Sequence, residues 1–455
     1  MNKGKTLWLA ATIMAALAPA APAAAQTAPG FDVPAARARI DALLDKNYPE
    51  LDALYKDLHQ HPEVGFQEVR TAGLLAAKMR KLGFTVTEHV GKTGLVALYR
   101  NGPGPVVLIR TELDALPMEE KTGLPYASRA QQTVDGTLTY VDHACGHDSH
   151  MSWWVGTAQT LLAMKDQWHG TLMFVGQPSE ELGAGAQAML DDGLFTRFPK
   201  PDYGFAAHVG PDRAGVITVK QGPVTSASDT VAITFHGVGA HGSMPDKGID
   251  PIVEAARFVQ DVQTVISRQK DPQKFGVVTV GSFHAGTVAN IIPDHADVQL
   301  TLRSYDPDVR KLLLDGVATT AKASAEMAHA PAPDVAHKMG IASVVNAPAL
   351  ATDAATVLTA ALGADKVRLV SEFSPGGTAS EDYSAYALAG MKQSVFFGIG
   401  GSDPAMLARL AAEGKPVPVN HSPFFAPQPE PAIRAGVETL TLAVLMVAGN
   451  GATAR

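Results

Sequence analysis

Potential metal ligands are most concentrated in one short stretch, His143-Ala-Cys145-Gly-His147-Asp148-Ser-His150. Thiolate, imidazole and carboxylate groups are the ligands that metals of the zinc type bind. Cys145 and His147 are two residues apart, so an extended or turning backbone can direct both side chains to one side. Two other interpretations stay open: a Cys–His pair buried without a function, and a cysteine nucleophile with a histidine base. Cys145 is the only cysteine, which excludes an internal disulfide.

Two adjacent carboxylates, Glu180 and Glu181, follow the apolar run Leu172–Val175. Carboxylates sheltered from water repel each other unless a cation is near. One could then bind a metal while the other accepts a proton from an activated water. The same pair on a solvated surface would have no such role, but its position after a buried run favours the metal site.

Two single histidines, His208 and His421, occur further along the chain. His208 comes directly after the apolar run Phe205–Ala207, and His421 lies in a proline-containing loop. Each alone is more often a hydrogen-bonded structural residue than a ligand. Together with the groups above they supply ligands from four separate loops, enough for two divalent ions with open positions. The predicted ligands are Cys145, His147, Glu181, His208 and His421.

The elements that must position these residues follow a repeated pattern of an apolar run and a polar group. Val106–Ile109 precedes Arg110, and Thr171–Val175 precedes Gln177. Helix-like segments lie between such runs, which predicts an α/β sheet with helices on its faces. Ligands bind beyond the carboxyl ends of the strands in such sheets, where the polar groups fall. Helices are predicted over residues 33–61, 151–164, 184–194, 251–267, 308–327 and 432–447.

Between residues 226 and 340 the pattern changes. Val231, Ile233 and Phe235 alternate with polar or small residues, as is typical of a strand with one exposed face. The predicted order of elements is β-α-β-β-α-β, the split ferredoxin-like unit. The sequence therefore predicts a larger domain in two parts, 33–225 and 341–450, interrupted by an inserted domain at 226–340.

The N-terminal segment has the pattern of a secretory signal peptide. Lys3 and Lys5 precede an apolar run from Leu7 to Leu17, and small residues follow at Ala23–Ala25. We expect a signal peptide over residues 1–25 and an exported protein, periplasmic or secreted. The run is too short for a stable membrane span. An N-terminus that stays tethered to the membrane is the alternative.

The composition is that of a globular protein, with 46% hydrophobic and 18% charged residues. The formal net charge is −8, which argues against a nucleic-acid-binding surface, because such surfaces carry a basic patch.

A series of longer motifs stands in one order along the chain. They are His59-Gln-His-Pro-Glu63, Arg110-Thr-Glu-Leu-Asp-Ala-Leu-Pro117, His143-Ala-Cys-Gly-His-Asp148, Gln177-Pro-Ser-Glu-Glu181, His208-Val-Gly-Pro211, Gly239-Ala-His241-Gly, Asn290-Ile-Ile-Pro293 and Asn420-His-Ser-Pro423. With these motifs the chain resembles the M20 metallopeptidase family, in particular its amidohydrolase branch of aminoacylases, hippurate hydrolases and auxin-conjugate hydrolases. The resemblance covers nearly the whole chain after the signal peptide. It implies a zinc-peptidase-like catalytic domain with an inserted lid or dimerisation domain.

The resemblance also implies how the ligands are shared between two metal ions. Cys145 would bridge both ions. Glu181 and His421 would complete one of them, and His147 and His208 the other. Zinc is the expected metal, with manganese, cobalt or nickel as alternatives.

Further roles are implied for residues outside the ligand set. Glu180 would be the general base, and Asp114 would orient the ligands. His241, Asn290 and Arg303 would hold the substrate carboxylate or the developing oxyanion, with the histidine often supplied by the partner subunit of a homodimer. For Arg303 an exposed position on the polar face of its strand is an equal alternative.

Some residues depart from the pattern of this branch, although none removes a ligand. Glu112 stands where an aspartate is usual, and Ser179 and Leu182 flank the glutamate pair where alanine and glycine are usual. Trp153 and Trp154 occupy positions where smaller aliphatic residues are common. We expect both tryptophans to be core residues, because they lie on an apolar helix face.

The predicted activity is metal-dependent hydrolysis of an amide bond next to a free carboxylate. N-acyl amino acids, amino-acid conjugates and small peptides all suit this machinery, as substrates of an aminoacylase or a carboxypeptidase. Two alternatives remain: a non-catalytic exported protein that binds metal or peptides, and a thiol hydrolase that depends on Cys145.

Overall fold

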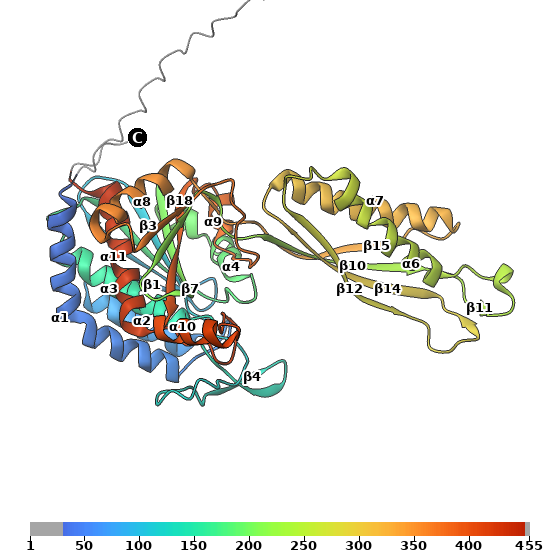
Figure 1. The fold of residues 1–455 in the computed structure, drawn as a ribbon, viewed down its shortest axis with the longest axis horizontal. Coiled ribbons are helices and arrows are strands. Elements are labelled where there is room, and N and C mark those ends of the chain that lie inside the picture. The colour runs from blue at the N-terminus through green and yellow to red at the C-terminus, as the bar shows by residue number, and fades with distance from the viewer. Residues whose placement is uncertain (1–30, 451–455) are drawn as a thin grey trace, which may run out of the picture.

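The computed structural model describes residues 31–450, which form a larger α/β body and a smaller α+β body side by side (Figure 1). The signal peptide predicted over residues 1–25 lies outside the described residues.

An eight-stranded sheet forms the centre of the large body, in the order β1-β2-β6-β3-β7-β18-β8-β17. The four central strands, β6, β3, β7 and β18, are parallel to one another, whereas β1, β2 and β8 pair antiparallel with their inner neighbours. Val107, Leu108 and Ile109 are consecutive and fully buried, which requires cover on both faces of the sheet. The strands are β1 (Thr85–Val90), β2 (Gly94–Asn101), β3 (Val106–Glu112), β6 (Gly170–Gln177), β7 (Tyr203–Arg213), β8 (Ile217–Lys220), β17 (Val367–Val370) and β18 (Gln393–Ser402).

Helices cover both faces of this sheet. One face packs against α1, α3, α8 and α11, and the other against the shorter α4, α5 and α9. The mixed α/β fold class predicted from the sequence is confirmed. The helices of the large body are α1 (Val33–Gln60), α2 (Val69–Lys81), α3 (His147–Ala163), α4 (Gly185–Asp191), α5 (Leu194–Arg197), α8 (Pro348–Leu362), α9 (Ser384–Leu388), α10 (Pro404–Glu413) and α11 (Pro429–Ala448).

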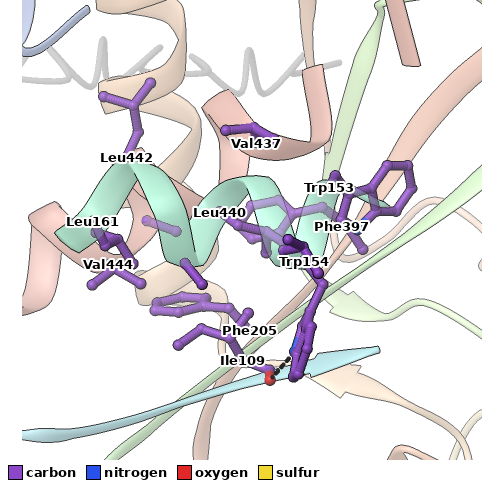
Figure 2. Close-up of a cluster of buried hydrophobic side chains, with 14 of the residues drawn as sticks. Ile109, Trp153, Trp154, Leu161, Phe205, Phe397, Val437, Leu440, Leu442 and Val444 are labelled. Atoms are coloured by element: carbon purple, nitrogen blue, oxygen red, sulfur yellow. Dashed lines mark hydrogen bonds between the residues drawn. The ribbon is translucent and has the colours of Figure 1, made fainter. Parts of the chain in front are cut away.

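Trp153 and Trp154 lie where α3 crosses α11 and the sheet (Figure 2). Both are fully buried, so the prediction that they are core residues is confirmed. The indole Nε1 of Trp154 donates to the carbonyl oxygen of Ile109 at 3.0 Å, which satisfies the one polar atom of that side chain. A β-carbon on Gly436 of α11 would lie 2.3 Å from Cδ2 of Trp153, so only a glycine leaves room for this ring.

Helix α11 is, among the described helices, the one long and apolar enough to meet the length and composition of a membrane span. However, 78% of its most apolar stretch is buried inside the protein, where it packs against α1 and α3. That burial is typical of a core helix.

The small body is a four-stranded antiparallel sheet in the order β12-β14-β10-β15, with two helices on one face. Along the chain its main elements follow the order β-α-β-β-α-β. They are β10 (Ala227–His236), α6 (Pro251–Asp261), β12 (Gly276–Ala285), β14 (His295–Ser304), α7 (Pro307–Met327) and β15 (Asp334–Ile341). A short pair, β11 (Ala240–His241) and β13 (Ile291–Ile292), lies at the end far from the large body, and single turns occur at Pro245–Lys247 and Val265–Gln269 (Figure 1).

Two segments connect the bodies, and they are paired with each other. β9 (Gly222–Pro223) pairs antiparallel with β16 (Val345–Asn346), and Val224 N donates to the carbonyl oxygen of Val344 at 2.8 Å. The remaining strands, β4 (Gln131–Val134) and β5 (Thr137–Tyr140), form a hairpin at the surface of the large body.

Candidate metal centre

The predicted ligands come from loops at the carboxyl ends of the central strands and from one strand. Cys145 lies just before α3, and His147 is the first residue of that helix. Gly146 between them has φ 88°, and a β-carbon there would lie 2.4 Å from Cγ1 of Val209. A glycine is therefore needed to turn the chain into the helix. His208 was predicted to follow the end of a strand. Instead it lies within β7, which continues beyond it to Arg213.

The loop that carries His421 is held against the loop of Cys145. His421 N donates to the carbonyl oxygen of Ala144 at 2.9 Å. The amide of Asn420 donates to the carbonyl oxygens of Cys145 and Val209, both at 3.0 Å. His421 itself has φ 67°, a left-handed conformation that is uncommon for residues other than glycine.

The five predicted ligands converge in space. Sγ of Cys145 lies 3.3 Å from Nε2 of His208. Nε2 of His421 lies 3.2 Å from one carboxylate oxygen of Glu181, and Nε2 of His147 lies 3.9 Å from the other. One ligand atom each of Cys145, His147 and Glu181 lie within 4.8 Å of one another.

Some of these ligand atoms lack partners although they are buried. Nε2 of His147 and Oε1 of Glu181 make no hydrogen bond to the described residues. Buried polar atoms are almost always hydrogen-bonded or bound to an ion, and these two face the same point as the thiol of Cys145. Sulfur, nitrogen and oxygen together are the donor set of a zinc-type metal, so the residues fit divalent ions.

The imidazole rings are oriented by their other nitrogen. Nδ1 of His147 lies 2.7 Å from the carbonyl oxygen of Asp114, and Nδ1 of His208 lies 2.7 Å from that of Val209. A carbonyl oxygen can only accept, so both Nδ1 atoms carry a proton, and in the neutral ring, which is the form that binds a metal, Nε2 presents the lone pair. The carboxylate of Asp114 also accepts from the backbone N of Glu181 at 2.9 Å, so Asp114 contacts two predicted ligands.

The thiol of Cys145 is in an environment that disfavours its charged form. Burial raises the pKa of this thiol well above its usual value, and the carboxylates of Glu181 and Glu180 raise the pKa further. A thiolate here therefore requires a neighbouring positive charge, which a metal ion would supply. This environment disfavours a free thiolate nucleophile.

Sequence reasoning missed the buried layer beneath the ligands. His150 is fully buried, and its Nδ1 lies 2.9 Å from a carboxylate oxygen of Glu112. Val209 N donates to Nε2 of His150 at 2.9 Å, so Nδ1 carries the proton and donates to Glu112. Burial opposes the charge of Glu112, but Arg110 and His150 hold the pKa of its carboxyl well below the usual value.

A second part of this layer surrounds the predicted general base, Glu180. Burial raises the pKa of Glu180 well above its usual value, and Glu381 is the next cause. Arg110 compensates the nearby negative charges: its Nη2 donates to Glu381 at 2.7 Å, and its Nε donates to Gln177 at 2.9 Å. Glu381 is far from Arg110 in sequence and in no motif, so no local signal could have revealed it.

The ligands open into a cavity of about 850 Å³ between the two bodies. From the large body it is lined by Glu180, Glu181 and His421, and from the small body by Ser228 and Arg303. Arg303 is therefore in the cavity rather than on an outer surface. It donates to the hydroxyl of Ser228, and in the described part of the chain it forms no ion pair.

His241 and Asn290 lie elsewhere. Both are exposed and lie at the β11–β13 end of the small body, where Gly242 N donates to the carbonyl oxygen of Asn290 at 2.8 Å. This end points away from the large body, so neither residue lines the cavity of its own chain (Figure 1).

The sequence profile of peptidase family M20/M25/M40 matches residues 108–438, which include all five predicted ligands, the whole small body and most of the large body. The chain belongs to this family. The family resemblance of the motifs is thereby confirmed, and so is the prediction of a metallo-hydrolase at the level of the family.

Similar proteins include hydrolases with different substrates. The chain is 38% identical to a hippurate hydrolase of Campylobacter jejuni over 58% of its length and 66% of the relative, slightly less than two thirds. It is 35% identical to an N-acetylcysteine deacetylase of Bacillus subtilis over 73% of its length and 83% of the relative. A dinuclear metal-binding M20 peptidase of Bacillus subtilis has a similar structure, with a TM-score of 0.70, 28% identity, and coverage of 89% of this chain and 99% of that one.

Proposed function

We propose that this protein hydrolyses an amide bond next to a free carboxylate, in N-acyl amino acids, amino-acid conjugates or small peptides. The observation that carries the proposal is the convergence of two unpartnered ligand atoms, on His147 and Glu181, with the thiol of Cys145 in a cavity that also contains Arg303. Relatives named as a hippurate hydrolase and an N-acetylcysteine deacetylase support the class of substrate.

Two divalent ions, zinc in the first place, would be held by Cys145, His147, Glu181, His208 and His421. When bound, they would supply positive charge that polarises the amide carbonyl and makes water more acidic. Glu180 lies 3.9 Å from Nε2 of His147, so its carboxylate is next to the ligands without being one of the predicted set. From there it would accept the proton of the attacking water and return it to the departing amine.

Arg303 would bind the carboxylate of the substrate. It lines the same cavity as the ligands and has no carboxylate partner among the described residues. A guanidinium group binds a carboxylate with two parallel hydrogen bonds, so it would also fix the direction in which the scissile bond points.

A homodimer formed through the small body is part of the proposal. His241 and Asn290 do not line the cavity of their own chain and lie at the end of the small body that points away from it. In the proposed dimer, this end of one chain would reach the cavity of the other. Around His241 this end exposes large apolar side chains, of which Met244 is 55%, Val288 53% and Ile291 56% exposed. We also propose export of the protein, on the pattern of residues 1–25.

The proposal is tested with Glu180→Gln. We expect this variant to keep its divalent ions and lose kcat by roughly 10²–10⁴-fold, because the substitution removes the proton acceptor and keeps the shape. The measurement combines metal analysis with initial rates on N-acyl amino acids and dipeptides, each compared with its uncharged carboxamide. Glu181→Gln is the matched control and should lose metal as well as rate.

Full activity of Glu180→Gln would contradict the role of this residue. Equal rates on the free acids and their carboxamides would contradict the role of Arg303. Activity that survives removal of all metal by a chelator, but not alkylation of the thiol, would instead indicate a hydrolase that depends on Cys145.

A further inference from the structure

A second group of potential metal ligands lies in the large body, outside the predicted catalytic set. It consists of His59 near the end of α1, Glu120 in the segment after β3, and Asp142 just before the Cys145 loop. All three residues are buried, with exposed fractions of 2%, 4% and 1%. One ligand atom of each lies within 4.8 Å of the others.

The facing atoms of this group are close together without bonding to each other. Nε2 of His59 lies 3.2 Å from Oε2 of Glu120, yet the geometry is not that of a hydrogen bond and Nε2 has no other partner in the described chain. Oδ2 of Asp142 is likewise buried and unpartnered there. Two ligands of one zinc ion, with bonds of about 2.1 Å at a tetrahedral angle, would be separated by roughly 3.4 Å.

The far side of the imidazole is fixed as it is in known metal sites. Nδ1 of His59 lies 2.6 Å from Oδ2 of Asp148, a carboxylate that is 1% exposed. Histidine ligands of metals usually donate their other ring N–H to such a carboxylate, which directs the free nitrogen toward the ion. The edge of the Tyr126 ring also packs on this imidazole, with 5.3 Å between ring centroids.

The charges of this region are not balanced by the side chains around it. Glu120, Asp142 and Asp148 bring three carboxylates together, and among the described residues no lysine or arginine pairs with any of them. Burial raises the pKa of Asp142 to about 7, and the charge of Glu120 contributes to that shift. Burial opposes the charge of His59, but Asp148 and Glu120 raise the pKa of its imidazole to about 10. Without an ion, a protonated His59 therefore neutralises one carboxylate and still leaves Oδ2 of Asp142 without a partner among the described residues.

We propose that His59, Glu120 and Asp142 form an additional, structural site for a divalent cation, separate from the two ions of the cavity. One nitrogen and two oxygen ligands favour zinc or manganese. The ion would join α1 to the segment that leads into Cys145, and it would hold that segment against the large body.

The test counts zinc ions in the full chain after saturation with zinc and dialysis to remove loosely bound metal. We expect three ions per chain in the wild type, as the sum of two cavity ions and one structural ion. Asp142→Asn and His59→Gln should each contain two. Glu119→Gln is the matched control, because Glu119 is the exposed neighbour of Glu120, and it should contain three.

A second measurement separates this site from the cavity and does not require the site variants to fold. The double variant Cys145→Ala/Glu181→Ala removes cavity ligands only, and we expect it to retain one cobalt ion per chain. That cobalt should lack the near-ultraviolet charge-transfer band of a thiolate complex, because no sulfur lies in the proposed site.

A zinc count that Asp142→Asn and His59→Gln leave unchanged from the wild type would overturn the proposal. His59 would then be an imidazolium between Asp148 and Glu120. Loss of all cobalt in the cavity double variant would overturn it too. Neither result depends on whether the protein hydrolyses amides, so a failure of this site and a failure of the proposed function are distinguishable.

Discussion

The histidines of the candidate centre are set by contacts on the side away from the cavity. Backbone carbonyl oxygens accept from Nδ1 of His147 and His208, so the main chain fixes the orientation of both rings. Asp114 has a double role, since its carbonyl oxygen orients His147 and its carboxylate accepts from the backbone of Glu181. The folded chain thus fixes the position of these imidazole rings, and the direction in which each Nε2 points, before any ion binds.

At the residue scale we predict that Asp114→Ala weakens metal binding by about 10–100-fold, because Glu181 loses the acceptor that holds its backbone. Competition with a chromophoric chelator measures the affinity. Asp114→Asn keeps an oxygen that can accept the same hydrogen bond, and its affinity should fall less. If the alanine variant bound metal as tightly as the wild type, Asp114 would not position the ligands.

Motifs allowed the predicted ligands to be named from the sequence, because each lies in a cluster of ligand-type residues, after an apolar run or in a proline-containing loop. His150 and Glu112 escaped that reasoning. Their contact spans two elements, and only the crossing of α3 over β3 brings them together. Arg110 and Glu381 illustrate the same limit, since the partner of a buried charge is chosen by tertiary packing rather than by local spacing.

At the scale of elements, the packing of α3 on α11 depends on close approach. Gly436 faces the ring of Trp153 with no space for a side chain, and the neighbouring residues of both helices are buried (Figure 2). Because α3 begins with His147, the position of this helix also sets the position of a predicted ligand.

We therefore predict that Gly436→Ala lowers the free energy of unfolding by about 1–3 kcal/mol, the usual cost of overpacking a core. Chemical denaturation measures the change. Gly73→Ala is the control: Gly73 lies within α2, nothing stands within 4 Å of an added β-carbon, and the helix should become slightly more stable. Equal effects of the two substitutions would contradict the steric argument.

Most elements could be predicted because their apolar residues recur with a clear period. The predicted helix 33–61 corresponds to α1 (Val33–Gln60), and the helix expected over 308–327 corresponds to α7 (Pro307–Met327). The helix expected over 251–267 was too long, since α6 ends at Asp261 and a separate turn follows. The short pairs β9–β16 and β11–β13 left no periodic signal, because two residues cannot show a period.

At the scale of the whole molecule, the residues proposed for one reaction lie in two parts of the structure that are far apart in space. Arg303 lies in the cavity, whereas His241 and Asn290 lie at the opposite end of the small body. A single chain therefore cannot bring all of them to one substrate in this arrangement.

Mixing two inactive variants tests whether two chains complete each other. His241→Ala and Glu180→Gln proteins are each expected to be nearly inactive. After the subunits of an equal mixture reassort at random, half of the dimers contain one chain of each variant. One of the two sites in such a dimer is intact, so about a quarter of wild-type activity should return. Activity of the mixture is measured against the two unmixed samples, with light scattering to follow the dimer.

No recovery despite exchange of subunits would contradict a shared site. A monomeric wild-type protein at working concentrations would contradict it as well.

The paired connectors β9 and β16 restrict how the two bodies can move. Since Gly222–Pro223 and Val345–Asn346 are hydrogen-bonded to each other, the small body cannot pivot on one connector while the other stays still. We therefore expect relative rotation of the bodies to occur mainly about an axis across this two-stranded ribbon. Arg303 would then travel along one fixed arc past His421, so the length of a substrate that both can reach is limited by the backbone of the ribbon rather than by the cavity wall.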